Sequence, residues 1–148
     1  NDNSKGQSVI SGFIGDINKL CELLTTLKIK FVKLPVSAPF HCKLMRNATL
    51  IMEKEIKKIK FKKPKISIFS NVTAKPSTDE TDLKKYLIKQ IESPVRWREI
   101  VTNMIDEKVN TFVEIGPGKV LSGLVKRINR NVTLNQINNL EDINEFKK

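Results

Sequence analysis

Residues that build metal sites and disulfide frameworks are scarce in this 148-residue chain. It contains one histidine and two cysteines, and the cysteines, Cys21 and Cys42, lack a CxxC spacing. A tetrahedral metal site needs four ligands, which one histidine beside one cysteine cannot supply, so we predict no metal centre. Two isolated cysteines also exclude a dense disulfide framework, and we expect reduced thiols in a cytosol-like compartment.

Long apolar runs are missing as well. No segment approaches the roughly 20 apolar residues of a membrane-spanning helix. The first residues do not follow the charged, apolar and small-residue pattern of a signal peptide. We therefore expect a cytoplasmic protein that has no membrane partner.

Acidic residues are few in relation to basic ones. The chain has 27 Lys and Arg against 16 Asp and Glu, which gives a formal net charge of +11 at pH 7. Such a charge favours an anionic partner, but the basic residues are spread along the chain, as compositional drift would also leave them. Aromatic residues are only 6% of the chain and no nucleic-acid-binding motif is present, so a basic nucleic-acid-binding domain is the least favoured alternative.

Strand and helix patterns alternate along the chain, and 39% hydrophobic residues suffice for a core. The patterns predict strands over residues 8–11, 30–36, 65–72, 111–115 and 132–137, and helices over residues 15–27, 43–59, 82–91, 94–105, 120–128 and a C-terminal segment. Asp16 is the expected N-cap of the first helix, and strand 111–115 has the composition of a buried strand. This alternation indicates an α/β fold with largely parallel strands.

The glycine turn "GPGK" at residues 116–119 connects a predicted strand to a predicted helix. A Walker loop needs four residues between its glycines and a Ser or Thr after the lysine, and this turn has neither. We therefore interpret it as a tight strand-to-helix turn. The stretch "GQSVI" at residues 6–10 lacks the second glycine of a nucleophile elbow and precedes a strand, whereas an elbow follows one.

The one histidine, His41, stands in "VSAPFHCKLM" between a predicted strand and a predicted helix. A lone histidine is more often structural than catalytic. Its place matters, however, because α/β folds put their working residues in the loops that follow strands. His41 is therefore the candidate general base, and the residues alone leave its nucleophile unidentified.

Five segments together carry a family resemblance, in order and over nearly the whole chain: "NDNSKGQSVISG", "LPVSAPFHCKLM", "IFSNVTAKP", "LIKQIESPVRW" and "FVEIGPGKVLSGLVKRI". They resemble the C-terminal half of the malonyl-CoA:acyl carrier protein transacylases. The resemblance implies the C-terminal part of an α/β-hydrolase-like acyltransferase domain plus the end of its small ferredoxin-like subdomain. Residues 1–36 would end the ferredoxin-like subdomain, and residues 37–148 would be the C-terminal part of the large subdomain.

By this resemblance the enzyme transfers malonyl from malonyl-CoA to the phosphopantetheine thiol of an acidic acyl carrier protein in fatty acid biosynthesis, without a cofactor. His41 would be the base that activates a serine, held by the main-chain carbonyl of Gln90, although Gln90 can also be read as an ordinary helix-end residue. Phe40 would favour malonyl over methylmalonyl, because a phenyl ring leaves less room for an α-methyl group, although one methyl group is worth only about 1–3 kcal/mol of discrimination. Alternatively, Phe40 packs under the loop.

The family's GHSLG serine is absent from these residues, and so are its carboxylate-binding arginine and its oxyanion-hole glutamine. Ser37 is near His41 in sequence, but its loop is not an elbow. We therefore expect a fragment that is inactive alone and that needs the missing N-terminal half as a partner. The alternative is an inactive fragment that works as a carrier-protein-binding module.

Overall fold

The computed structural model describes residues 1–146, and these residues form two compact units. The first unit contains Asn1 and Val9–Val95, and the second contains Asp2–Ser8 together with the chain from Arg96 onward. The subdomain boundary at residues 36 and 37 stays a prediction.

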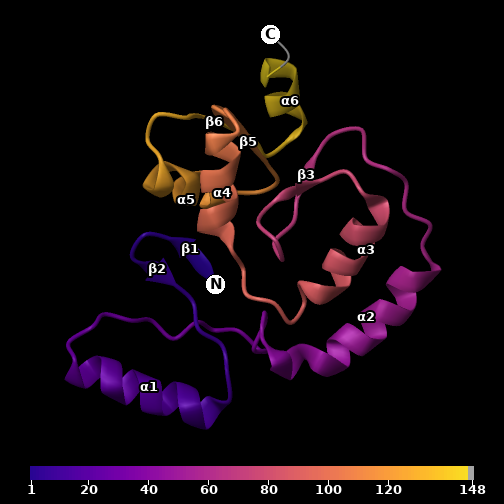
Figure 1. The fold of residues 1–148 in the computed structure, drawn as a ribbon. Helices are drawn as coiled ribbons and strands as arrows, with labels where there is room; N and C mark the ends of the chain where they lie inside the picture. Colours follow the sequence, from indigo (N-terminus) through magenta and orange to yellow (C-terminus); the bar gives the residue numbers. More distant parts are fainter. Residues whose placement is uncertain (147–148) are drawn as a thin grey trace. The chain divides into compact units, whose positions relative to one another are not determined.

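The first unit is mostly helical and contains one small hairpin (Figure 1). Its elements are α1 (Ile14–Thr26), the 3-10 helix η1 (Lys43–Met45), α2 (Arg46–Lys58), β3 (Ile68–Phe69), β4 (Pro76–Ser77) and α3 (Glu80–Lys89). The strands β3 and β4 pair antiparallel, and α2 packs against α3. His41 and Gln90 therefore flank the two packed helices, one just before η1 and the other just after α3.

Side chains define the ends of α2 and α3. Asp79 caps α3, because its carboxylate accepts a hydrogen bond of 2.7 Å from the N–H of Asp82. Lys84 reaches from α3 to the end of α2, where its ammonium donates to the carbonyls of Lys57 at 3.0 Å and Ile59 at 2.7 Å. A cation at a helix C-terminus satisfies orphan carbonyls and complements the helix dipole. Lys84 therefore connects the middle of α3 to the C-terminal end of α2.

The second unit is built on a β-α-β element. Its parts are β1 (Asp2–Ser4), β2 (Gln7–Ser8), α4 (Trp97–Asp106), β5 (Thr111–Ile115), α5 (Val120–Ile128), β6 (Thr133–Ile137) and α6 (Leu140–Phe146). β5 and β6 pair in parallel from Thr111↔Thr133 to Ile115↔Ile137, with α5 as the crossover. The buried apolar residues of this unit come from α4 and α5: Ile100, Val101, Leu124 and Val125.

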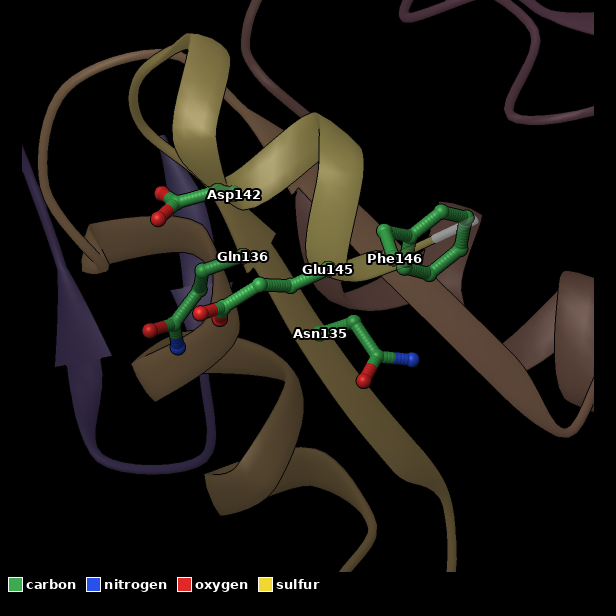
Figure 2. A pocket seen from close by; sticks show the side chains of 5 residues that line it. All are labelled: Asn135, Gln136, Asp142, Glu145 and Phe146. Atoms are coloured by element: carbon green, nitrogen blue, oxygen red, sulfur yellow. The ribbon is translucent and has the colours of Figure 1, made fainter. Parts of the chain in front are cut away.

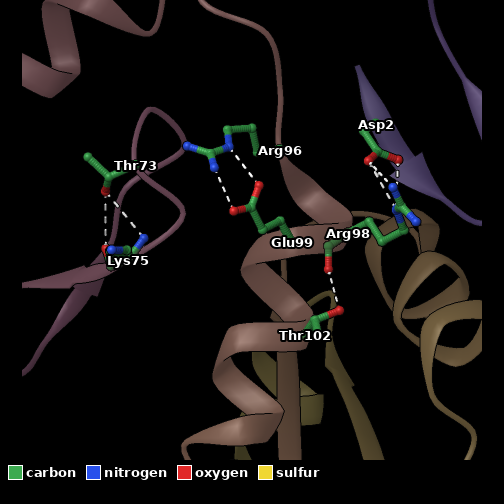
Figure 3. A network of polar contacts seen from close by, with 7 residues as sticks. All are labelled: Asp2, Thr73, Lys75, Arg96, Arg98, Glu99 and Thr102. Carbon is green, nitrogen blue, oxygen red and sulfur yellow. Dashed lines mark hydrogen bonds and ion pairs between the residues drawn. The ribbon is translucent and has the colours of Figure 1, made fainter.

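The hairpin β1–β2 belongs to this second unit although it lies at the start of the sequence. Arg98 in α4 donates to both carboxylate oxygens of Asp2, at 2.7 and 3.0 Å, and Arg127 in α5 donates to the side chain of Gln7. Figure 3 shows the Arg98–Asp2 pair beside the local Arg96–Glu99 pair at the start of α4. A bidentate arginine contact fixes orientation as well as distance, so the hairpin is held against both helices.

Several predicted elements are confirmed. The helix over 120–128 matches α5, residues 43–59 form η1 and α2, and strands 111–115 and 132–137 are β5 and β6. The α3 and α4 helices also exist, with starts shifted by two or three residues. Asp16 is not the N-cap of α1, because that helix begins at Ile14 after Phe13 and places Asp16 in its first turn.

The strand predictions are partly wrong. Residues 30–36 form no strand, because no described strand lies beside them to complete the hydrogen bonds that a strand requires. The strand over 8–11 is replaced by β2 at Gln7–Ser8, and the strand over 65–72 shrinks to β3. Parallel pairing holds for β5 and β6, whereas the two hairpins are antiparallel, because short connections without a crossover helix join their strands.

Strand 111–115 was expected to be buried, and this is also wrong. Its residues alternate between exposed and half-buried, and Ile115 is 78% exposed. In a sheet of two strands, α5 packs against β5 and β6, and the alternate side chains point away into solvent.

Among the described residues, no helix is long and apolar enough to cross a membrane.

Candidate active site

The loop before η1 holds His41 in an unusual backbone conformation. Its φ is 61°, in the left-handed region, which costs a residue other than glycine about 1–3 kcal/mol. Local hydrogen bonds enforce it: the Phe40 N–H donates to the Ala38 carbonyl at 3.0 Å, and the Cys42 thiol donates to the Pro39 carbonyl at 3.1 Å. Backbone strain of this kind persists where the surroundings over-determine it, frequently at functional sites.

The imidazole of His41 meets the main chain at the end of α3. Its Nδ1 lies 3.3 Å from the carbonyl oxygen of Gln90, across 49 residues of sequence. A carbonyl can only accept, so Nδ1 must carry the proton in this contact, and in the neutral ring Nε2 is then left as the acceptor. The distance is long for a hydrogen bond, as is common at catalytic sites without substrate. This arrangement leaves Nε2 able to receive a proton.

Gln90 acts here through its main chain. It is the C-cap residue of α3, and its carbonyl also accepts from the Ser93 N–H at 3.2 Å. The structure therefore brings together His41 and the Gln90 carbonyl, the two groups that the resemblance paired. Both interpretations of Gln90 from the sequence describe it, since it is a helix-end residue and its carbonyl contacts the histidine.

Phe40 directly precedes the histidine in the loop. Its side chain is 49% exposed, whereas His41 is half-buried. About half of the Phe40 surface is covered, so packing under the loop and a role in specificity both stay predictions. An exposed ring beside His41 is free to contact a bound acyl group, so the specificity interpretation stays open.

A polar contact connects the start of α2 to the segment after α3. Arg46 lies 3.4 Å from a carboxylate oxygen of Glu92, with side chains 63% and 22% exposed respectively. Exposed ion pairs of this kind contribute about 0–1 kcal/mol. Like the His41–Gln90 contact, it connects the chain around η1 to the end of α3, so it helps only weakly to hold these two segments together.

The "GPGK" turn does not form a phosphate cradle. The side chain of Glu114 already accepts from the N–H groups of Leu121 at 2.9 Å and Ser122 at 2.7 Å, and from the Ser122 hydroxyl at 2.6 Å. Burial raises the pKa of Glu114, but these hydrogen bonds together outweigh it and leave the pKa below its usual value. An internal carboxylate therefore occupies the start of α5, where a bound phosphate would sit.

A hollow of about 250 Å³ lies between β6 and α6 in the second unit (Figure 2). The Asn138 N–H donates to Asp142 at 2.7 Å and holds the pKa of that carboxyl below its usual value. None of the predicted site residues lines this hollow, whose walls are Asn135, Gln136, Asp142, Glu145 and Phe146. Across residues 1–146, His, Cys, Asp and Glu side chains do not gather in groups of three or more that could hold a metal ion.

Two residues that make long-range or capping hydrogen bonds were not singled out from the sequence. Glu114 caps α5 from a strand, and Asn71 contacts the segment that follows α3. Asn71 stands in the quoted segment "IFSNVTAKP", and an asparagine beside a strand end is typical of a turn. Neither pattern says which distant group the side chain reaches.

Comparison with known proteins identifies the family. The family model described as acyl transferase domain matches residues 2–143. The chain belongs to this acyl transferase family. The resemblance read from the sequence is thereby confirmed.

Individual relatives agree with the family match. The chain is 41% identical over 144 residues to the malonyl CoA-acyl carrier protein transacylase of Staphylococcus aureus (strain COL), covering 97% of this chain and 47% of that protein. It is 40% identical over 142 residues to the Bacillus subtilis (strain 168) protein of the same name, covering 95% and 45%. The chain therefore spans about half the length of the curated relatives it matches.

Solved structures show the same fold. The malonyl CoA-acyl carrier protein transacylase of Clostridium perfringens superposes with a TM-score of 0.83 at 35% identity, over 90% of this chain and 42% of that one. A second match, at TM-score 0.81 and 29% identity, covers 89% of this chain and 43% of a malonyl-transacylase in complex with a type II polyketide acyl carrier protein. The α/β acyltransferase fold is confirmed, as part of a domain.

Proposed function

We propose that this chain supplies the general base of an acyltransferase that moves malonyl from malonyl-CoA to the phosphopantetheine thiol of an acyl carrier protein in fatty acid biosynthesis. The observation that carries the proposal is the 3.3 Å contact between His41 Nδ1 and the Gln90 carbonyl. This contact leaves Nε2 as an acceptor. The similarity to malonyl CoA-acyl carrier protein transacylases over 97% of the chain supports the choice of substrate.

The proposed reaction has two halves, and its nucleophilic serine lies in the N-terminal half of the domain, outside these residues. In the first half, Nε2 of His41 accepts the serine proton while the serine oxygen attacks the malonyl thioester carbonyl. The tetrahedral intermediate then collapses, and the proton passes from His41 to the leaving CoA sulfur. In the second half, His41 deprotonates the pantetheine thiol, which attacks the malonyl ester, and the proton returns to the serine oxygen.

Two further features support details of this proposal. The exposed ring of Phe40 stands directly before His41, where it would limit the room for an α-methyl group on the acyl chain. The net charge of +11 favours an acidic carrier protein as the second substrate, chiefly by raising its association rate.

A fusion enzyme tests the proposal. It joins the N-terminal part of the S. aureus relative, which this chain does not cover, to residues 1–148. We expect this fusion enzyme to transfer radiolabelled malonyl to carrier protein, and His41→Ala to abolish most of the transfer. Gln90→Ala is the matched control, because alanine keeps the main-chain carbonyl, so its activity should stay near that of the parent.

Three outcomes are informative. Loss in His41→Ala with retention in Gln90→Ala supports the proposal. Equal activity of His41→Ala and the parent overturns the catalytic role of His41. A fusion enzyme that folds and binds carrier protein without any transfer favours the carrier-binding module instead.

A further inference from the structure

The Gln90 carbonyl belongs to a turn that is weakly held by its own backbone. After α3, the chain from Gln90 to Pro94 makes successive turn hydrogen bonds of 3.3, 3.3 and 3.2 Å, donated by Ile91, Glu92 and Ser93. These are long for N–H···O bonds. Pro94 has no N–H and cannot add another. The Ser93 hydroxyl adds one shorter bond of 2.8 Å, to the Lys89 carbonyl. Contacts from elsewhere supplement these bonds in positioning the carbonyl that meets His41.

Asn71 supplies the strongest such contact. Its side-chain Nδ2 donates to the Pro94 carbonyl at 3.0 Å, across 23 residues of sequence. Arg46 supplies another contact, to Glu92, which is longer at 3.4 Å. Asn71 thus anchors the far end of the turn, and Arg46 touches its middle.

The turn that carries Asn71 is itself rigid. The Ala74 N–H donates to the Ser70 carbonyl at 2.8 Å, and the Val72 N–H donates to the Ser70 hydroxyl at 3.1 Å. Ser70 and Ala74 are buried, with exposed fractions of 7% and 0%. A side chain on a rigid, buried turn can transmit its position to whatever it holds.

We propose that Asn71 is a positioning residue for the acyl transfer: it anchors the turn 90–94 so that the Gln90 carbonyl holds His41 in the Nδ1–H form. The inference rests on the proposed role of His41 as the base. Free histidine favours the opposite form, with the proton on Nε2. Loosening the turn therefore allows the ring to present an N–H where it must accept the serine proton.

Substitutions at two positions of the same turn test this role in the fusion enzyme. Asn71→Asp keeps the shape of the side chain but replaces the NH2 group that donates to the Pro94 carbonyl by an oxygen. Asn71→Ala removes the whole side-chain amide. Thr73→Ala is the matched control, because the Thr73 hydroxyl bonds within the same turn, to the main chain of Lys75 at 3.2 and 3.5 Å (Figure 3).

Kinetics and nitrogen chemical shifts are measured on all the variants. For both Asn71 variants we expect kcat to fall about three- to tenfold with KM unchanged, the factor that one ordinary hydrogen bond represents. The ¹⁵N shifts of His41, assigned as the signals missing in His41→Ala, should show the Nδ1–H form in the parent and in Thr73→Ala. In the Asn71 variants the Nε2–H form should gain population.

Two results would overturn the inference. One is that Asn71→Asp shows the same ¹⁵N shifts of His41 as the parent, whatever the stability of the variant. Asn71 would then be a merely structural residue. The other is an equal fall of kcat in Thr73→Ala. If His41→Ala retains activity, the proposed function fails, but the ring signals still show whether Asn71 sets the form of His41, so the two failures are distinguishable.

Discussion

The segment 30–36, which is exposed in this chain, offers a sharp test of whether another half of the domain covers it. Val32 is 81% exposed, and the nearby Leu34 and Val36 are 51% and 60% exposed. Burying a valine fully is worth at least about 1.5 kcal/mol. We therefore expect Val32→Ser to lower the stability of the fusion enzyme by about 1–2 kcal/mol. In the chain alone it should change stability by less than about 0.5 kcal/mol, as exposed substitutions do.

The assay is urea unfolding of both proteins, with Lys30→Ser as the matched control in the neighbouring exposed position. We expect the parent chain alone to bind the dye ANS and to self-associate, because the apolar residues Val32, Leu34 and Val36 are all exposed. Equal small effects of Val32→Ser in both proteins would refute the idea that the missing half covers this segment. A monomeric chain alone that unfolds cooperatively without binding ANS would refute it as well.

Three further outcomes follow from the same structure. Incubation of the chain alone with radiolabelled malonyl-CoA should leave no acid-stable label, and stoichiometric labelling of a serine would disprove the need for a second half. Because the pKa of Glu114 is lowered in the folded state, its carboxylate stabilises the fold above the usual glutamate pKa and stops doing so as pH falls through the lowered value. Glu114→Gln should thus lower the urea midpoint of the fusion enzyme at pH 7, with the difference closing in acid, and a constant difference would count against the cap. Transfer to an acidic carrier protein should weaken as salt rises. The dependence on salt should become shallower when four exposed lysines after α2 are changed to Gln: Lys60, Lys62, Lys63 and Lys65. An unchanged dependence on salt would exclude a role for these lysines.

The sequence predicted the helices better than it predicted the strands, and the roles of the site residues stay predictions. His41 could be found because it is the one histidine and stands in a recognisable motif, and α5 because its apolar period follows a glycine turn. Residues 30–36 have a strand pattern but no strand, since pairing depends on a neighbour that a local pattern does not contain. The contacts of Asn71 and Glu114 could not be predicted, because each depends on which remote group the fold brings within reach.

The central claim is that His41 removes the serine proton, and a single-turnover measurement tests it directly. The fusion enzyme is mixed rapidly with malonyl-CoA, and the burst of released CoA gives the rate of acylation before carrier protein is added. General bases contribute about 10²–10⁴-fold, so the burst in His41→Ala should be slower than in the parent by a factor in that range. A burst of unchanged rate and amplitude in His41→Ala would show that acylation proceeds without this histidine and that His41 is a packing residue of its loop.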